Sequence, residues 1–355
     1  MLIAAYTPMA RLRSRPSGKV TAISDSAVGA ANAPPMPWTT RAVITSAITG
    51  TLGLSALVYG LSNAATSQNG QSHWGDTKVV VSLVATVVLL AAFVVIEGRS
   101  PHALVPFRVL QNRNRSGAYI IMLCVGTAMF GMFFFLTLFV QEVWGYSALR
   151  SGIAYLPFVA MILVATAAAS QLVPRVGARP LLLVGSVLGA GGLFWLSQVT
   201  EHSSYAGGLL GPMMVTAFGF GLMFVPLSLL ALSKVREEDT GVASSLLNTG
   251  QQVGGSIGLA ILGTVAWSSF ANNLGSASAK AKAAAVAAAH AGHPVSKAKA
   301  AADQTSIFHH ALAYGFSHGY YVSAGIAVIA LVITALMINV KREDLAGINP
   351  MQAGV

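Results

Sequence analysis

The chain has 355 residues, of which 54% are hydrophobic and only 9% are charged, and its mean hydropathy is +0.67. Soluble domains contain about 25% charged residues, so this composition excludes an ordinary soluble domain and indicates a lipid environment. The net charge of +10 does not indicate nucleic-acid binding, because the Lys and Arg residues fall between apolar runs rather than on one basic face. The single cysteine, Cys124, excludes an internal disulfide framework and a Cys-based metal site.

A transmembrane helix needs about 20 consecutive, mostly apolar residues. Eight stretches meet this requirement, and no Asp, Glu, Lys or Arg lies inside any of them as drawn. The second stretch is the most clearly apolar, and the first is the least, because Thr and Ser residues interrupt it. We therefore predict an all-α membrane protein with about eight transmembrane helices, over residues 42–62, 79–96, 118–140, 152–170, 180–198, 208–232, 242–267 and 319–340.

The distribution of Lys and Arg predicts the orientation of these helices. If residues 1–41 lie in the cytoplasm, fifteen of the 21 Lys and Arg residues fall on the cytoplasmic side and six on the other. Four of those six belong to one long loop, where the positive-inside rule is weak. We expect a multi-pass protein of the plasma (inner) membrane with both termini in the cytoplasm.

Two regions lack the features of a spanning helix. Residues 1–41 mix Arg, Ser, Pro, Gly and Ala, and we interpret them as a disordered, atypical N-terminal segment. Residues 271–307 are rich in Ala and Lys, a composition that favours helix but provides no large apolar face. We expect an irregular external loop over residues 268–310 that contains a fraying helix.

The seventh predicted span combines a small-residue stripe with two carboxamides. Gly250, Gly254 and Gly258 recur every four residues, a pattern that allows another helix to approach closely. At 100° per residue, Asn248 and Gln252 fall on a different face of the same helix. Polar side chains within a span face protein or water rather than lipid. Two interpretations remain open: these carboxamides hydrogen-bond across helices, or they line a substrate cavity.

The third predicted span has a soft apolar surface formed by Met and Phe side chains. Met132 and Phe134 belong to the run AMFGMFFF, and polarizable side chains of this kind adapt to varied apolar ligands. The alternative is ordinary packing in the bundle or against lipid. We carry both residues forward as candidate cavity residues.

The sequence offers little support for an enzyme. There is no HExxH and no pair of carboxylates inside a predicted span, and residues 254–258 match GxSxG only within an apolar run, without the strand-to-turn context that this motif requires. His290, His293, His309 and His310 can in principle contact a metal ion, but Asp303 is their nearest acidic neighbour in the sequence. We therefore expect no enzyme activity, no metal site and no cofactor.

Four motifs resemble one known family. They are GTLGLSALVYGL (50–61), GMFFFLTLFVQEVWGYSALRSGIAYLP (131–157), RVGARPLLLVGSVL (175–188) and GVASSLLNTGQQVGGSIGLAILGTV (241–265). Together they resemble the fourteen-helix drug:proton antiporters of the major facilitator superfamily, in the EmrB/QacA-like branch. The likeness covers roughly residues 45–345. It implies two extra transmembrane helices over 42–96, a cytoplasmic linker over 97–117, a six-helix C-terminal bundle over 118–345 and a cytoplasmic tail over 346–355.

The resemblance also implies a function and its limits. It implies efflux of amphipathic or cationic small molecules in exchange for protons, and it makes Arg175, Gly177 and Arg179 a cytoplasmic loop motif. Pro174 stands where the family has an acidic residue. The eight spans match only the last eight of fourteen, so the chain looks N-terminally truncated. Because alternating access requires two bundles, the alternatives are a non-transporting membrane fragment or an assembly partner of a chain that supplies the N-terminal bundle.

Overall fold

The computed structural model describes residues 41–64, 72–100, 103–290 and 296–340, and every regular element in these ranges is helical. Eight of the helices in these ranges are long and apolar enough to cross a membrane. The predicted all-α membrane fold with about eight spans is therefore confirmed. The expected disordered segment 1–41, apart from Arg41, and the expected tail 346–355 lie outside the described residues.

The long helices alternate with short connections. They are α2 (Arg41–Ala64), α3 (Thr77–Arg99), α4 (Arg113–Leu138), α6 (Leu156–Val176), α7 (Ala178–Leu196), α8 (Leu210–Leu232), α9 (Thr240–His290) and α10 (Lys297–Met337). The short elements are η2 (Phe107–Val109), η3 (Phe139–Val143), α5 (Ala148–Ala154), η4 (Tyr205–Leu209) and η5 (Glu237–Asp239). Most spans are longer than predicted because polar and charged residues at their ends continue the helix.

Local capping explains where several helices begin. The side chain of Asn112 accepts hydrogen bonds from two backbone N–H groups in the first turn of α4, and Ser147 and Ser296 each cap one N–H of α5 and α10. Gly177 separates α6 from α7 with φ +86°, a left-handed conformation that favours glycine. Helix α7 therefore begins directly after Gly177, without an intervening loop.

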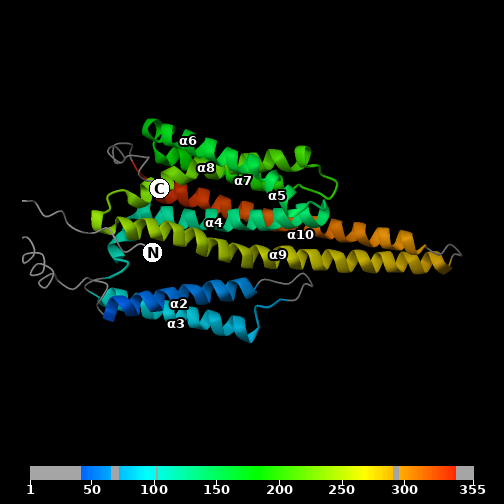
Figure 1. The fold of residues 1–355 in the computed structure, drawn as a ribbon, viewed down its shortest axis with the longest axis horizontal. Coiled ribbons are helices and arrows are strands. Elements are labelled where there is room, and N and C mark those ends of the chain that lie inside the picture. Colours follow the sequence, from blue (N-terminus) through cyan, green and yellow to red (C-terminus); the bar gives the residue numbers. More distant parts are fainter. Residues whose placement is uncertain (1–40, 65–71, 101–102, 291–295, 341–355) are drawn as a thin grey trace, which may run out of the picture.

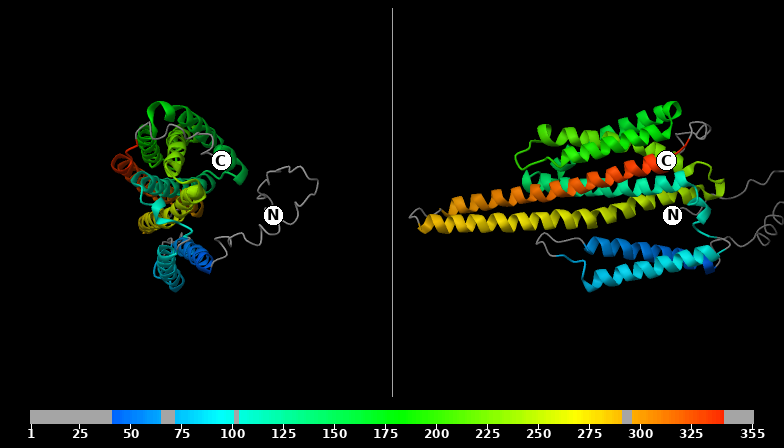
Figure 2. Two further views of the ribbon diagram at one scale, coloured as in Figure 1. Left: turned by 90° about the vertical axis from the view of Figure 1, so that its left-hand side faces the viewer. Right: turned by 180° about the vertical axis from the view of Figure 1, so that it is seen from behind.

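Helices α4 and α6 to α10 form one bundle, and α2 and α3 form a separate pair beside α9 (Figure 1). The end-on view shows the α2–α3 pair outside the bundle, next to α9 (Figure 2). The bundle core contains four fully buried rings, those of Phe135, Phe158, Phe220 and Phe316. Many valines of α3 are exposed, as expected for a helix that faces lipid.

Helices α9 and α10 extend far beyond the bundle as a helical hairpin (Figure 1). The 51 residues of α9 span about 76 Å at 1.5 Å per residue, compared with a hydrocarbon thickness of about 30 Å. The expectation of an irregular region is therefore wrong for 268–290 and 297–310, which are helical. The reason is that a high-propensity Ala-rich sequence continues a helix that is already nucleated in the bundle.

Candidate functional site

The candidate site is built on the seam between α4 and α9, which run parallel in near backbone contact. Along α9, Gly250, Gly254 and Gly258 face the carbonyl oxygens of Tyr119, Leu123 and Thr127, respectively. A methyl group added to Gly258 would lie 2.5 Å from the Thr127 oxygen. Thr127 Oγ1 donates a hydrogen bond of 2.8 Å to the Gly254 carbonyl. The glycine stripe thus lies at the closest approach of the two helices.

Asn248 and Gln252 lie one turn apart on α9, and both side chains are exposed in this structure. Asn248 Nδ2 is 3.5 Å from the carbonyl oxygen of Ser244 in its own helix, which is a marginal hydrogen bond. Across the described residues, no hydrogen bond is seen between either carboxamide and another helix. Within the described residues, these carboxamides therefore do not join α9 to another helix.

The two candidate residues on α4 do not lie on the same surface. Phe134 is 41% exposed, whereas Met132 is fully buried in the bundle core at 0% exposure. Helix α4 is apolar on all sides, so its sequence does not show which residues face outward.

Phe130, which the sequence analysis did not select, is 44% exposed and lies one turn before Phe134. Its ring packs against Gly255, where an added methyl group would lie 2.8 Å from the ring. The four-residue spacing between Phe130 and Phe134 places both on one face of a helix, and this spacing is the sequence signal that could have identified Phe130. Gly255 lies on the same face of α9 as Asn248 and Gln252, so the ring of Phe130 borders the exposed surface that carries the two carboxamides.

The loop motif between α6 and α7 caps a third helix. Arg179 Nη2 donates to the carbonyl oxygen of Ala335 at 2.9 Å, and Arg113 Nη2 donates to that of Leu336 at 2.6 Å. Both carbonyls belong to the last turn of α10, where the backbone has no helical partner and the helix dipole is negative. Gly177 forms the turn itself, and Arg175 is exposed.

The end of the bundle that contains η2 and η5, here called the linker end, is held by a charged network. Arg108 donates from Nε to Asp239 Oδ2 at 2.8 Å, and from Nη2 to Asp239 Oδ1 at 3.1 Å and Glu238 Oε1 at 2.8 Å. The hydrogen bond with Arg108 lowers the pKa of Asp239, and in return Asp239 raises the pKa of Arg108. These residues are 130 or more positions apart, and the sequence analysis did not connect them.

A second ion pair lies at the opposite end, here called the hairpin end. His310 Nδ1 of α10 is 2.8 Å from Glu201 Oε1 in the connection between α7 and α8, and His202 lies 3.6 Å from the same oxygen. Burial raises the pKa of Glu201, but the hydrogen bond with His310 and the charges of both histidines lower it to below its ordinary value. His293 lies outside the described residues. The described part of the chain holds no group of three or more His, Cys, Asp or Glu arranged for a metal ion.

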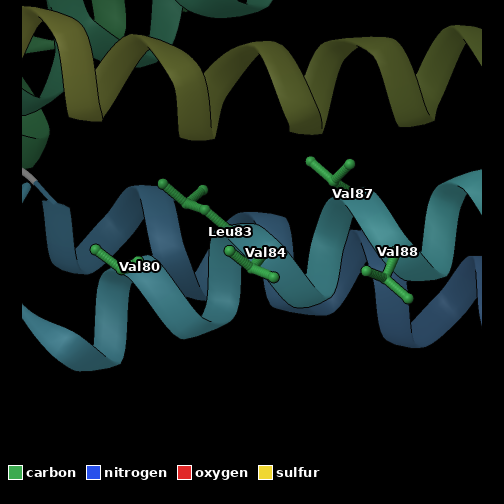
Figure 3. A pocket seen from close by; sticks show the side chains of 5 residues that line it. All are labelled: Val80, Leu83, Val84, Val87 and Val88. Carbon is green, nitrogen blue, oxygen red and sulfur yellow. The ribbon is translucent and has the colours of Figure 1, made fainter.

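An open apolar groove lies on α3, away from the carboxamides. Val80, Leu83, Val84, Val87 and Val88 line it, and the close-up shows these side chains along the helix below α9 (Figure 3). Ligand sites usually combine an apolar wall with a few converging polar groups. This groove has no polar lining, so the seam between α4 and α9 is the better candidate for a drug-binding surface.

Comparison with known proteins identifies the family. A family profile described as Major Facilitator Superfamily matches residues 20–259, and the match begins inside the segment 1–41 that the sequence analysis had set apart. The cephamycin export protein CmcT of Amycolatopsis lactamdurans is 37% identical over 232 residues, which cover 64% of this chain and 47% of that protein.

Two further relatives have names that refer to drug resistance. The puromycin resistance protein pur8 of Streptomyces alboniger is 31% identical, with 80% of this chain and 50% of the relative covered. The multidrug resistance protein Stp of Mycobacterium tuberculosis is 31% identical, with 61% and 39% covered. The chain spans about half the length of the curated relatives that it matches. With a family match over more than half of its residues, the chain belongs to the major facilitator superfamily.

Proposed function

We propose that this chain forms the C-terminal part of an efflux transporter of the fourteen-helix, EmrB/QacA-like branch. The names of its relatives support export: one is a cephamycin export protein and others are puromycin and multidrug resistance proteins. In this proposal α2 and α3 are the two extra helices, and α4 with α6 to α10 is the C-terminal bundle. In the proposed orientation, the linker end and both termini face the cytoplasm.

One observation carries the proposal: Asn248 and Gln252 are exposed on α9 within a span, on the helix face where the ring of Phe130 packs against Gly255. An exposed carboxamide in the hydrocarbon region is unfavourable unless it faces water or protein. A surface with two carboxamides and the ring of Phe130 offers hydrogen bonds and an aromatic face together. That combination suits amphipathic or cationic compounds, because aromatic faces attract cations.

Proton coupling is proposed from the family resemblance. Among the described residues, the carboxylates lie near helix ends, in connections or in the extended hairpin rather than beside Asn248 and Gln252. A proton carrier would then belong to an N-terminal bundle, which alternating access also requires. Either a longer form of this protein or a partner chain would supply that bundle.

Transport in proteoliposomes tests the proposal. The 355-residue chain is reconstituted with and without a second chain that supplies an N-terminal bundle, a pH gradient is imposed, and export of ethidium, an aromatic cation, is followed by fluorescence. Asn248→Ala and Gln252→Ala should each lower the export rate by roughly fivefold, equivalent to about 1 kcal/mol for one lost polar contact. Val87→Ala on the exposed surface of α3 is the matched control and should have no effect.

The same assay separates the alternatives. If the chain exports nothing alone but does so when an N-terminal bundle is supplied as a second chain, it is an assembly partner. If no export occurs in either case, the chain is a non-transporting membrane protein and the proposed efflux function is wrong.

A further inference from the structure

The α2–α3 pair is tied to α9 at the hairpin end by one side-chain hydrogen bond. Trp74 Nε1, in the turn before α3, donates to Thr264 Oγ1 of α9 at 2.9 Å. Thr264 can accept this bond because its own hydroxyl proton goes to the Ala260 carbonyl at 2.8 Å. The turn is shaped by His73 and Asp76, whose side chains are 2.9 Å apart on either side of Trp74. Between its ends, α2 packs along α9.

At the linker end the same pair is tied to the start of α9 through the linker. The buried Glu97 at the end of α3 accepts a hydrogen bond from the Val105 backbone N–H at 2.8 Å, which fixes the linker to α3. Three residues later, Arg108 makes its two-pronged contact with Asp239, the residue before α9 begins. The side chain of Asp239 is only 8% exposed.

A second arginine fixes the linker on its other side. Arg115 of α4 is 4% exposed and donates to the carbonyl oxygens of Val109 at 3.0 Å and Ser233 at 2.7 Å. It therefore joins the linker to the end of α8 as well as to α4. These hydrogen bonds anchor η2, and η2 in turn holds Arg108 in position opposite η5.

We propose that Trp74 and Arg108 are positioning residues, and that the α2–α3 pair acts as a brace that holds α9 at both membrane boundaries. The two contact points are Asp239, directly before α9, and Thr264 on α9. They are 25 residues apart, or about 37 Å along a helix, which slightly exceeds the hydrocarbon thickness of about 30 Å. Asn248 and Gln252 lie between them. Helix α9 is thus held by backbone packing against α4 on one face and by the brace on another.

The brace deepens the proposed function and rests on it for its consequence in transport. Helix α9 carries the carboxamides, so any shift of α9 relative to α4 changes their position relative to the ring of Phe130. The brace restricts such a shift. Releasing either contact should therefore weaken substrate binding before it affects folding.

Hydrogen exchange measured by mass spectrometry tests the brace without any transport. Arg108→Ala should raise amide exchange in residues 240–247 by roughly tenfold, because the first turns of α9 open more often. Arg108→Lys, which keeps the charge, should restore part of the protection. Arg236→Ala is the matched control, since Arg236 is exposed in the same connection and lies 3.5 Å from Glu238.

The contact at the hairpin end has its own variants. Trp74→Phe keeps an aromatic side chain, although a smaller one, and removes the donor, and Thr264→Val removes the acceptor at nearly constant volume. Both should raise exchange around residues 262–266, and Thr264→Ser, which keeps the hydroxyl, should not. If exchange in these two segments of α9 is unchanged in Arg108→Ala and Trp74→Phe, the brace is wrong.

The transport kinetics distinguish positioning from general destabilisation. In the ethidium assay, Arg108→Ala and Trp74→Phe should raise KM several-fold while the maximal rate per folded protein stays within about twofold, as expected when binding alone is weakened. A loss of maximal rate with unchanged KM contradicts the positioning role. If the exchange results hold but the unmodified chain exports nothing, either alone or with an N-terminal bundle, the brace stands and the proposed efflux function fails.

Discussion

Thr127 on α4 and Gly254 on α9 join two transmembrane helices by a hydrogen bond from a side-chain hydroxyl to a backbone carbonyl, at 2.8 Å. The contact is possible only because Gly254 has no side chain, and its α-carbon lies against the backbone of Leu123. Association of helices in lipid depends on such close packing of small residues and on interhelical hydrogen bonds. The seam that carries the candidate site is therefore rigid at its centre.

Substitution of Gly254 should destabilise this seam. In Gly254→Ala the added methyl group meets the Leu123 carbonyl, which cannot move freely, and we expect a loss of about 1–3 kcal/mol. Gly275→Ala in the extended part of α9 is the control, because nothing lies within 4 Å and alanine favours helix by up to about 1 kcal/mol. Thermal unfolding in detergent measures both. Equal melting temperatures for the two variants would rule out close packing at Gly254.

The arginine caps should stabilise the last turn of α10. Removing Arg179 leaves the Ala335 carbonyl without its donor, so Arg179→Ala should cost about 1 kcal/mol and raise amide exchange in the last turn. Arg175→Ala in the same motif is the control, because Arg175 is exposed. If both variants change exchange equally, the effect is one of general charge rather than of capping.

The Glu201–His310 pair should respond to acid. The folded-state pKa of Glu201 lies below its ordinary value of 4.5, so the unfolded chain takes up a proton at a higher pH than the folded one. The stabilisation is therefore complete above pH 4.5 and is lost as the pH falls through the lower folded-state pKa. At this partly exposed site we expect at most about 1 kcal/mol.

Melting temperatures between pH 7 and pH 3 check this response. Glu201→Gln should remove the part of the pH dependence that comes from the pair, and the difference between the two proteins should shrink toward pH 3. A difference that stays constant over this range would show that Glu201 does not gain stability from its ionised form.

Much of the fold could be predicted from the sequence, because a spanning helix requires a long apolar run whatever its neighbours. The stretch 79–96 lies within α3 for this reason. The extension of α9 to His290 could not, since its exposed Ala-rich sequence has no apolar face to show that it continues the helix. Hydropathy reports where a chain crosses lipid, and it says little about helices outside lipid.

The site was harder to predict, because it depends on contacts between distant segments. Periodicity separated the glycine stripe from Asn248 on α9, but it could not separate Met132 from Phe134 on a helix that is apolar all round. The pairing of Arg108 with Asp239 joins positions 131 residues apart and has no local signature. Only the packing of the linker against the start of α9 reveals it.

The central claim is that Asn248 and Gln252 face a water-accessible binding surface within the membrane. Labelling with a small, charged, membrane-impermeant maleimide tests it directly, because thiols react as thiolates and need water. Asn248→Cys and Gln252→Cys are compared with Val87→Cys, whose parent side chain is 69% exposed on α3, while the native Cys124 is buried. The account predicts rapid labelling at 248 and 252, slowed by ethidium, and little at 87. Labelling at 248 and 252 that is no faster than at 87 would contradict it.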